Sequence, residues 1–405
     1  MTSARVTSAY LVDATRTPFG RYRGALSQLR CDDLAALPLI ALQQRHPGLD
    51  WRLLDEVILG CANQAGEDNR NVARMAALLA GLPESVAAVT VNRLCASGLE
   101  AIGQGARAIA CGEADLVLAG GVESMTRAPY VMAKADNAFA REQQLVDTTL
   151  GWRFINPRLR DAHGVDSMMQ TADNLARAHH IARVDQDAYA LRSQQRAAHA
   201  QAAGWLAEEI TPAPVPSGKG TFDVAADEQL RSDTSAQGLA ALEPLLGPGT
   251  SITAGNASGL NDGAAAVLLA SPAAIERHGL RPMARIIGMA SAGVAPRTMG
   301  IGPVPAIRKL LDRTGLQLSD FDRIEINEAF AAQVLACTRA LGLADDAGHV
   351  NANGGAIALG HPLGASGARL AMTAAYALRR HGGKRALVSL CVGVGQGLAL
   401  ALEAA

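Results

Sequence analysis

Aromatic residues are scarce in this sequence, and it has no excess of positive charge. Phenylalanine, tyrosine and tryptophan together make up only 3% of the 405 residues. The 37 lysines and arginines are offset by 38 aspartates and glutamates, which leaves a formal net charge of −1. Nucleic-acid-binding proteins usually carry a basic stripe, and many also stack bases on aromatic rings. We therefore expect no nucleic-acid partner.

Long apolar runs are also missing. The longest candidates, residues 116–122 and 391–402, fall short of the ~18 residues that a membrane span requires. Residues 1–10 contain no basic segment followed by an apolar stretch, so no secretory signal is expected. We expect a protein that does not associate with membranes.

The sequence also lacks paired cysteines and the residue spacings that are typical of metal sites. The six cysteines stand singly, with no C-x-x-C pair, so a disulfide framework is not expected in so long a chain. His179 and His180 are adjacent and cannot both face one ion from a helix, so we expect no metal site. These features favour a reduced protein of the cytoplasm.

Apolar residues are abundant, at 49% of the chain, which excludes a largely disordered protein. Short apolar runs alternate with alanine-rich stretches of helical periodicity. We expect strands over residues 55–60 and 114–119, and helices over residues 71–80 and 96–110. This alternation predicts an α/β fold with covered sheets.

Segments in the two parts of the chain resemble each other in order. Asp55-Glu-Val-Ile-Leu resembles Asp322-Arg-Ile-Glu-Ile, and an Ala-Ser-Gly step follows each, centred on Ser97 and Ser366. These separations are 42 and 44 residues, and a strand-like segment follows each serine after 18 and 19 residues. The ordered series indicates two duplicated halves.

A region of different composition separates these repeats, at about residues 123–254. It contains a polar helix expected over residues 185–201 and a proline- and glycine-rich segment, 211–220, expected to be a loop. We interpret the region as an insertion that supplies substrate contacts. The predicted organisation is an N-terminal half over residues 1–270, carrying this insertion, and a C-terminal half over residues 278–405.

Cys95 is the first candidate for chemistry. The segment Val91-Asn-Arg-Leu-Cys-Ala-Ser-Gly98 places it where a strand passes into a helix. The unpaired N–H groups and partial positive charge of a helix N-terminus lower a thiol pKa, so Cys95 is a candidate nucleophile. An inert buried cysteine is the alternative.

His361 precedes the equivalent helix in the second half, within Gly360-His-Pro-Leu-Gly-Ala-Ser-Gly367. If the halves are related by a pseudo-twofold axis, the two helix starts face one shared site. A histidine beside a cysteine is the basic requirement of thiol catalysis. A structural histidine in a glycine-rich turn is the alternative.

Two further segments follow expected strands. Cys391-Val-Gly-Val-Gly-Gln-Gly397 comes after the strand expected over residues 386–390, and its backbone N–H groups are suited to holding an oxyanion. It lacks the full dinucleotide-binding pattern, so NAD binding is not favoured. Asn327 stands at the end of another strand, where its amide is placed to orient a water molecule or a substrate carbonyl.

Four blocks of this sequence, taken together, resemble the thiolase family. They occur in the family's order and are Asn92–Gly98, Asn327–Phe330, Gly360–Pro362 and Cys391–Gly397. The similarity runs from Asp13-Ala-Thr-Arg-Thr-Pro18 to the C-terminus, essentially the whole chain. It implies the thiolase fold, in which two similar halves form five αβαβα layers with an inserted loop domain.

Other segments look like one branch of that family, the 3-oxoadipyl-CoA (β-ketoadipyl-CoA) thiolases of aromatic catabolism. These segments are Gly60–Arg70, Gly151–Pro157 and Gly164–Met168. Val394 stands where many relatives carry glycine, and Ser167 stands where several acetoacetyl-CoA thiolases have histidine. Both departures suit the 3-oxoadipyl branch.

The resemblance also implies a role for each matching residue. Cys95 is the nucleophile that becomes acylated, and His361 accepts its proton and helps to bind the thioester oxygen. Asn327 holds a water molecule beside that oxygen. Cys391 moves the proton at the α-carbon of acetyl-CoA, and the N–H groups of Cys95 and Gly393 form a second oxyanion hole.

The implied reaction is the cleavage of 3-oxoadipyl-CoA by CoA to succinyl-CoA and acetyl-CoA, in a ping-pong sequence. CoA is a co-substrate, no metal or redox cofactor is implied, and the family suggests a homodimer or homotetramer. By the same resemblance, contacts to CoA fall on Met168, Arg231, Ala254, Ser258, Ala329 and Phe330.

Three alternatives stay open. The nearest is an acetoacetyl-CoA or broad 3-oxoacyl-CoA thiolase. A decarboxylating condensing enzyme is a second, although such enzymes usually place histidine at the position of Cys391. A non-catalytic lipid-binding relative is the third, and the joint presence of Cys95, His361 and Cys391 argues against it.

A substrate that ends in a carboxylate needs a cation or several N–H donors at the far end of its site. The inserted region and one nearby loop offer several such groups, although any single one of them can equally serve the surface. The candidates are Arg70, Trp152-Arg153, Arg158, Arg160 and His163.

Overall fold

The computed structural model describes residues 7–405. Residues 1–6 belong to the segment in which no secretory signal is expected, and they lie outside the described range. The strands are β1 (Ala9–Arg16), β2 (Gly20–Arg21), β3 (Glu56–Gly60), β4 (Ala87–Val91), β5 (Leu116–Ser124), β6 (Tyr130–Met132), β7 (Leu145–Asp147), β8 (Ala213–Ser217), β9 (Gly220–Val224), β10 (Asn261–Ala270), β11 (Ala284–Gly293), β12 (Arg323–Ile326), β13 (Arg385–Val392) and β14 (Gln396–Ala404). The helices are α1 (Cys31–Arg45), α2 (Val72–Leu79), α3 (Ser97–Cys111), α4 (Pro157–His163), α5 (Met168–Ala178), α6 (Arg183–Ala202), α7 (Ala236–Ala240), α8 (Pro272–His278), α9 (Pro303–Thr314), α10 (Ala331–Ala340), α11 (Ala356–Leu359) and α12 (Leu363–His381).

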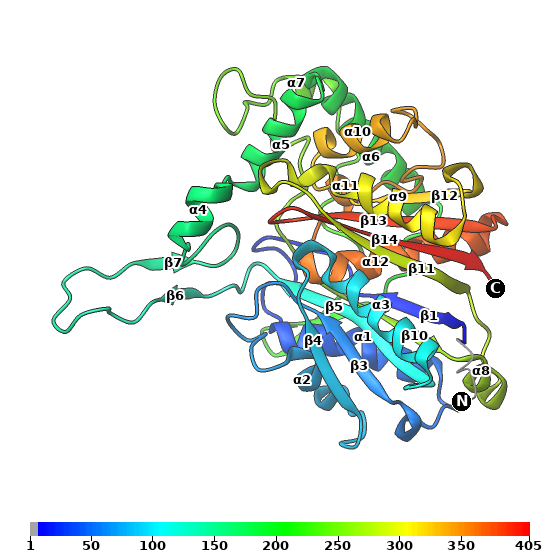
Figure 1. The fold of residues 1–405 in the computed structure, drawn as a ribbon. Coiled ribbons are helices and arrows are strands. Elements are labelled where there is room, and N and C mark those ends of the chain that lie inside the picture. The colour runs from blue at the N-terminus through cyan, green and yellow to red at the C-terminus, as the bar shows by residue number, and fades with distance from the viewer. Residues whose placement is uncertain (1–6) are drawn as a thin grey trace.

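The elements stack in five layers, as the α/β expectation requires. Figure 1 shows α3 and α12 in the middle layer, between two parts of the sheet, with α1 and α2 on one outer side and α9 and α10 on the other. The middle layer buries an apolar core that includes Leu99, Ile102 and Leu370, each fully buried. The αβαβα arrangement is therefore confirmed.

The strand order contains the predicted duplication. Half of the main sheet has the order β3-β5-β10-β1, and the other half repeats it as β12-β13-β14-β11. The first pair of each set is parallel and the next pair antiparallel. The two sets meet edge to edge, where β1 and β11 pair antiparallel over Ala9–Leu11 and Ala284–Ile286. The two sheet layers are thus one hydrogen-bonded sheet.

The first turn of α12 packs unusually closely against the first half. A Cβ atom added to Gly98 of α3, or to Gly121 of β5, would collide with the carbonyl oxygen of Gly364. Only glycine permits this approach at either position. The contact explains the glycine at position 121, and β5 continues to Ser124, beyond the expected end at residue 119, because it pairs with β10 over that whole length. The close approach of Gly364 also brings the starts of α3 and α12 together.

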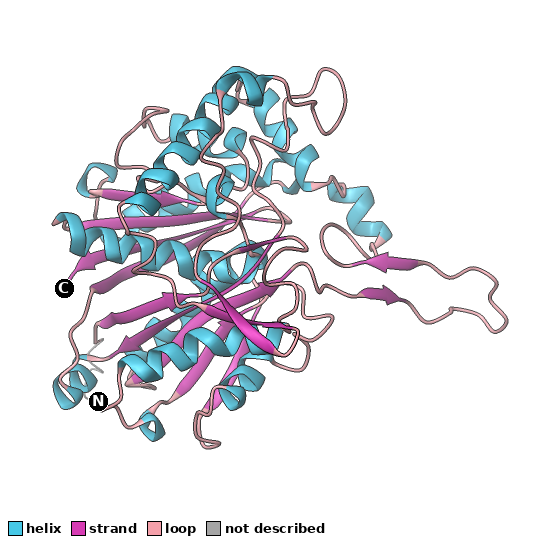
Figure 2. Ribbon diagram, turned by 180° about the vertical axis from the view of Figure 1, so that it is seen from behind, coloured by secondary structure: helices cyan, strands magenta, loops and turns pink. Residues whose placement is uncertain are grey.

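The insertion between β5 and β10 contains the helices α4–α7, of which α6 is 20 residues long, and two small hairpins. Figure 2 shows the β6–β7 hairpin and the neighbouring α4 projecting from the layered body. The polar helix expected over residues 185–201 is confirmed as α6. Residues 213–217, expected to be loop, instead form β8 paired with β9. Prolines are tolerated there because Pro214 and Pro216 stand on an exposed edge of a two-stranded hairpin.

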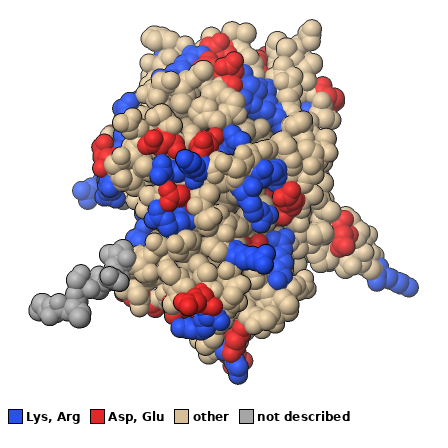
Figure 3. Space-filling model, turned by 90° about the vertical axis from the view of Figure 1, so that its right-hand side faces the viewer, with Lys and Arg blue, Asp and Glu red and all other residues tan. Residues whose placement is uncertain are grey.

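Charged side chains of both signs share the surface. On the face shown in Figure 3, basic and acidic groups are interspersed, in keeping with the balanced composition. Within residues 7–405, every helix is too short or too polar to cross a membrane.

Candidate active site

A cavity of about 420 Å³ lies at the junction of the two halves, beside the starts of α3 and α12. Both halves and the insertion contribute to its lining. Cys95 comes from the first half, His361 and Gly393 from the second, and Trp152 and Arg153 from the insertion. The repeat therefore predicted correctly that Cys95 and His361 share one site.

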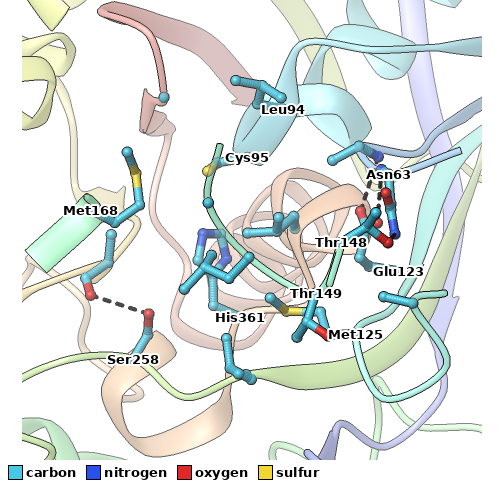
Figure 4. Close-up of a pocket in the computed structure, with 18 of the residues that line it drawn as sticks. Asn63, Leu94, Cys95, Glu123, Met125, Thr148, Thr149, Met168, Ser258 and His361 are labelled. Atoms are coloured by element: carbon cyan, nitrogen blue, oxygen red, sulfur yellow. Dashed lines mark hydrogen bonds between the residues drawn. The ribbon is translucent and has the colours of Figure 1, made fainter. Parts of the chain in front are cut away.

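Figure 4 shows how the labelled side chains are distributed around Cys95 and His361. Met168 and Ser258 lie on one side of this pair, and Asn63 and Thr148 lie on the opposite side. The site thus has two ends, with the candidate nucleophile between them.

Local hydrogen bonds fix the turn that carries Cys95. The Oδ1 of Asn92 accepts from the backbone N–H of Leu94 at 2.8 Å, and the Oγ of Ser97 donates to the carbonyl of Leu94 at 2.6 Å. Leu94 adopts a φ of 45°, in the left-handed region. This short 3₁₀ turn leads directly into α3, so Cys95 stands at a helix N-terminus, as predicted.

The pKa of Cys95 differs from the sequence-based expectation. Burial raises it to about 11, although the N–H of Gly393 and the backbone of Cys95 itself act in the opposite direction. The carboxyl group of Glu123 raises it further. The expectation that the helix N-terminus alone would lower this pKa was wrong, because desolvation of the thiolate outweighs the local N–H groups. The resting thiol is protonated and needs a base.

His361 is suited to be that base. Its Nδ1 lies 2.6 Å from the Oγ of Ser366, which donates its own proton to the carbonyl of Pro362 at 2.9 Å. Ser366 must therefore accept from Nδ1–H, which leaves Nε2 unprotonated. Burial, followed by the positive charge of Arg369, lowers the pKa of His361 to about 3. The ring is neutral at pH 7 and carries a lone pair rather than a proton on Nε2.

Asn327 adjoins that lone pair. Its Nδ2 lies 3.3 Å from the Nε2 of His361, and its backbone N–H donates to the carbonyl of Ser389 at 2.9 Å. Asn327 is fully buried, and within residues 7–405 nothing donates to its Oδ1. Asn327 contacts His361 without lining the cavity itself.

The loop between β13 and β14 supplies Gly393 and places Cys391 behind the cavity wall. Cys391 is fully buried at the end of β13, opposite Gly397 of β14, and does not line the cavity. Burial raises its pKa well above the usual value, and negative charge on Cys95 would raise it further, which indicates that the two thiols are neighbours. Val394, at the tip, adopts a φ of 63°, where a β-branched residue is strained and glycine is not.

The residues expected to bind CoA divide into two groups. Met168, Ser258, Ala329 and Phe330 line the cavity, and the Oγ of Ser258 donates to the carbonyl of Ala329 at 3.1 Å. Arg231 and Ala254 are exposed and do not line it. Met168 is the first residue of α5, whose start is fixed by a capping box in which Ser167 and Gln170 bond reciprocally.

The candidates for binding a distal carboxylate are likewise divided. Trp152 and Arg153 line the cavity, whereas Arg70, Arg158, Arg160 and His163 do not. Arg160 instead pairs with Asp161 on the surface. Position along a loop, rather than residue type, decides which cation reaches the site.

Several lining residues were not singled out from the sequence. Asn63 follows β3, Glu123 is the second-last residue of β5 and Thr148 follows β7, so they come together only in the fold. Glu123 accepts N–H groups from Ala62, Asn63 and Gly364 at 2.9–3.1 Å, and burial raises its pKa to about 7. The position of Asn63 within Gly60–Arg70 was the available signal.

Glu123 also belongs to a buried group with Cys61 and Asp68, whose ligand-type atoms lie within 4.8 Å of one another. The Sγ of Cys61 lies within donating distance of two acceptors, the Oδ2 of Asp68 at 3.7 Å and the Oε1 of Glu123 at 4.0 Å. Hydrogen bonds among these groups and to backbone N–H groups account for their clustering.

Comparison with known proteins supports the geometric argument. Residues 9–273 match the family described as "Thiolase, N-terminal domain", and residues 280–404 match "Thiolase, C-terminal domain". The chain is 65% identical to the beta-ketoadipyl-CoA thiolase of Pseudomonas aeruginosa, over 97% of this chain and 98% of that protein. It is 59% identical to the 3-oxoadipyl-CoA/3-oxo-5,6-dehydrosuberyl-CoA thiolase of Escherichia coli, over 98% of this chain and 99% of that protein.

Solved structures agree. Human mitochondrial 3-ketoacyl-CoA thiolase superimposes with a TM-score of 0.92 and 40% identity, covering 99% of this chain and 100% of that one. The site lies at the junction of duplicated halves, with a cysteine at one helix start and a neutral histidine at the other. The sequence matches extend along nearly the whole chain, and both findings lead to one conclusion. The chain belongs to the thiolase family.

Proposed function

We propose that this thiolase cleaves 3-oxoadipyl-CoA with CoA, giving succinyl-CoA and acetyl-CoA through an acyl-enzyme on Cys95. The observation that carries the proposal is the lining of the cavity. Cys95, His361 and Arg153 all line it. The names of the relatives in P. aeruginosa and E. coli point to the same substrate.

The first step in this proposal is attack by Cys95 on the C3 ketone. The Nε2 of His361, held unprotonated by its Nδ1 bond to Ser366, accepts the thiol proton. Both partners begin neutral, so the proton moves as the new C–S bond forms. The C2–C3 bond then breaks, and acetyl-CoA departs as its enolate.

Two groups of donors stabilise the negative oxygens in the proposed mechanism. Protonated His361 donates from Nε2 to one oxygen, and a water held by the unpaired Oδ1 of Asn327 assists it. The N–H groups of Cys95 and Gly393 form the second set, consistent with the way the backbone of both residues opposes the rise in the pKa of the Cys95 thiol. Fixed donors in a desolvated site stabilise developing charge strongly.

Cys391 is the proposed acid for the departing enolate. Its buried thiol keeps its proton until a strong base such as an enolate forms beside it. Separating this acid from the His361 base allows CoA to return and resolve the acyl-enzyme in a second half-reaction. The sequence of steps uses no metal or redox cofactor.

The proposed CoA site begins at the Met168 and Ser258 end of the cavity. Ala329 and Phe330 complete its inner part. Arg231 and Ala254, both exposed, are assigned to the outer part of the long CoA molecule. CoA thus enters as co-substrate from the end opposite Asn63 and Thr148.

A second candidate is an acetoacetyl-CoA or broad 3-oxoacyl-CoA thiolase. Much of the cavity is apolar, with Leu94, Met125, Leu150, Met299 and Leu363 in its lining. Such a surface also suits an uncharged acyl chain.

We also propose a homodimer or homotetramer in the cytoplasm. Strand β4 forms one end of the main sheet, and apolar side chains on the projecting segment are exposed, with Phe139 at 99% and Tyr130 at 67%. Exposed strand edges and apolar patches are typical of subunit contacts. A reducing compartment keeps Cys95 and Cys391 available for catalysis. The proposed halves are residues 1–270, with the insertion at about 123–254, and 278–405.

A substrate panel tests the proposed reaction. CoA-dependent cleavage of 3-oxoadipyl-CoA is compared with that of 3-oxohexanoyl-CoA and acetoacetyl-CoA. The proposal predicts the highest kcat/KM for 3-oxoadipyl-CoA. Similar values for all three compounds would favour the broad thiolase, and no cleavage of any would refute the assignment.

A further inference from the structure

Arg153 is the one lysine or arginine in the cavity lining within the described residues. It lies in the loop between β7 and α4, and the half-buried side chain of its neighbour Trp152 is tied down by a bond from Nε1 to the carbonyl of Asp166 at 3.3 Å. The guanidinium of Arg153 is therefore a cation held at the wall of an otherwise largely apolar site.

Two other guanidinium groups near this region already have acidic partners. Arg127 pairs with Glu67 at 2.6 Å, and Arg297 pairs with Asp166 at 2.9 Å. Within residues 7–405, Arg153 makes no ion pair, and its one hydrogen bond runs from Nη2 to the Oδ1 of Asn63 at 2.8 Å. A half-buried guanidinium with donors to spare is suited to a carboxylate, which it binds with two parallel hydrogen bonds.

A chain of hydrogen bonds fixes the direction of that cation. The Nδ2 of Asn63 donates to the Oγ1 of Thr148 at 3.1 Å, and Thr148 donates to the carbonyl of Pro129 at 2.6 Å. The backbone N–H of Asn63 donates to Glu123 at 3.1 Å. Asn63 thus turns its carbonyl oxygen toward Arg153 because its other polar groups are already engaged.

This arrangement lies at the appropriate end of the cavity. Figure 4 places Asn63 and Thr148 across Cys95 and His361 from Met168 and Ser258, where CoA is proposed to enter. When Cys95 attacks C3 of a 3-oxoacyl-CoA, the CoA side and the acyl remainder extend in opposite directions. In 3-oxoadipyl-CoA, the methylenes C4 and C5 separate the distal carboxyl from C3.

Glu123 also lines the cavity, and its charge must be considered. Its two oxygens already accept three backbone N–H groups, and burial raises its pKa to about 7. A partly protonated, fully bonded carboxyl repels an incoming carboxylate weakly. The Glu123 carboxyl group also does not neutralise the positive charge of Arg153.

We propose that Arg153 binds the distal carboxylate of the acyl group, with Asn63 as the residue that positions it. This inference rests on the proposed function and assigns its specificity to one guanidinium. It separates Arg153 from Arg158, which lies nearby in sequence at the start of α4 but outside the cavity.

The test compares kcat/KM for 3-oxoadipyl-CoA with that for 3-oxohexanoyl-CoA, which has the same chain length and no terminal charge. Arg153→Gln should lower the value for 3-oxoadipyl-CoA about ten- to a hundredfold, as expected for loss of a charge-assisted contact, and leave the uncharged compound near wild type. Arg153→Lys should recover part of the loss. Arg158→Gln, the matched control, should retain the wild-type ratio.

An acylation assay checks the same contact without the ketone. Arg153→Gln should slow transfer of succinyl from succinyl-CoA to Cys95, and not transfer of butyryl from butyryl-CoA. An unchanged preference in Arg153→Gln, an equal loss for both compounds, or a lost preference in Arg158→Gln would each overturn the inference. A wild-type enzyme that does not favour 3-oxoadipyl-CoA would instead refute the proposed function itself.

Discussion

The Nδ1 of His361 lies 2.6 Å from the Oγ of Ser366, and this contact determines which ring nitrogen carries the proton. Because the hydroxyl of Ser366 donates its own proton to the carbonyl of Pro362, it can only accept a hydrogen bond from His361. The Nε2 atom is then the free base at the cavity. Ser366 also marks the internal repeat, so one serine serves both the fold and the site.

Replacing Ser366 with alanine should therefore impair catalysis. The Nδ1–H group loses its acceptor, and the ring is free to place its proton on Nε2, the wrong nitrogen for a base. We expect kcat for thiolysis to fall about ten- to a hundredfold, which corresponds to one lost buried hydrogen bond. Steady-state kinetics measure this directly.

Thr338→Ala is the matched control, because it removes a buried hydroxyl that bonds only within its own helix, to Leu335. It should leave kcat near wild type. A Ser366→Ala enzyme with wild-type kcat would show that Ser366 does not direct the His361 proton.

Replacing Cys391 with serine should separate the two half-reactions. Proton transfer at the α-carbon of acetyl-CoA should slow by about 10²–10⁴-fold, since the alcohol is a much weaker acid than the thiol. Acyl transfer from a simple acyl-CoA to Cys95 should continue, because that step uses His361. Exchange of the acetyl α-protons with deuterium from solvent reports the first process.

Cys337→Ser provides the comparison for this experiment. Cys337 is also fully buried, with its Sγ donating to the carbonyl of Gly300 at 3.2 Å, and the proposed mechanism gives it no part. Its exchange rate should match wild type. Near-normal exchange in Cys391→Ser would remove Cys391 from the role of acid and base.

The low pKa of His361 predicts how stability changes with pH. Its pKa is about 3 in the folded protein and 6.5 for an unperturbed histidine, so between these pH values the unfolded chain binds the extra proton. Folding stability must then fall as pH decreases from about 6.5, and this group costs about 2 kcal/mol at pH 5. Urea unfolding at pH 7 and pH 5, at one protein concentration, measures the change.

His361→Gln should lose less stability than wild type over that range. Glu123 and Glu325, whose pKa values are raised by burial to about 7 and about 8, contribute with the opposite sign, but they are present in both proteins and cancel in the comparison. An identical loss in both proteins would contradict a neutral, buried His361.

Local sequence was a good guide to where chemistry-bearing residues stand along the chain. Matched spacings around Ser97 and Ser366 predicted the duplication, and hence the meeting of Cys95 and His361. Short-range patterns also located α2 and α3 to within a residue or two. These features depend on neighbours in sequence, which periodicity records.

Properties that depend on distant packing were not predictable in this way. The pKa of Cys95 is raised rather than lowered, because its burial results from contacts between both halves. Arg153 and Arg158 carry the same charge in one short segment, yet only the path of the loop decides which faces the cavity. The β8–β9 hairpin escaped prediction because prolines usually mark loops, and an exposed strand edge tolerates them.

The most direct test of the account is the mass of the peptide that contains Cys95 after incubation with 3-oxoadipyl-CoA in the absence of free CoA. Without CoA to resolve the intermediate, Cys95 should retain a succinyl group as a thioester, and adding CoA should release it as succinyl-CoA. A label on another cysteine, or no label on any, would contradict the assignment of Cys95 as the nucleophile.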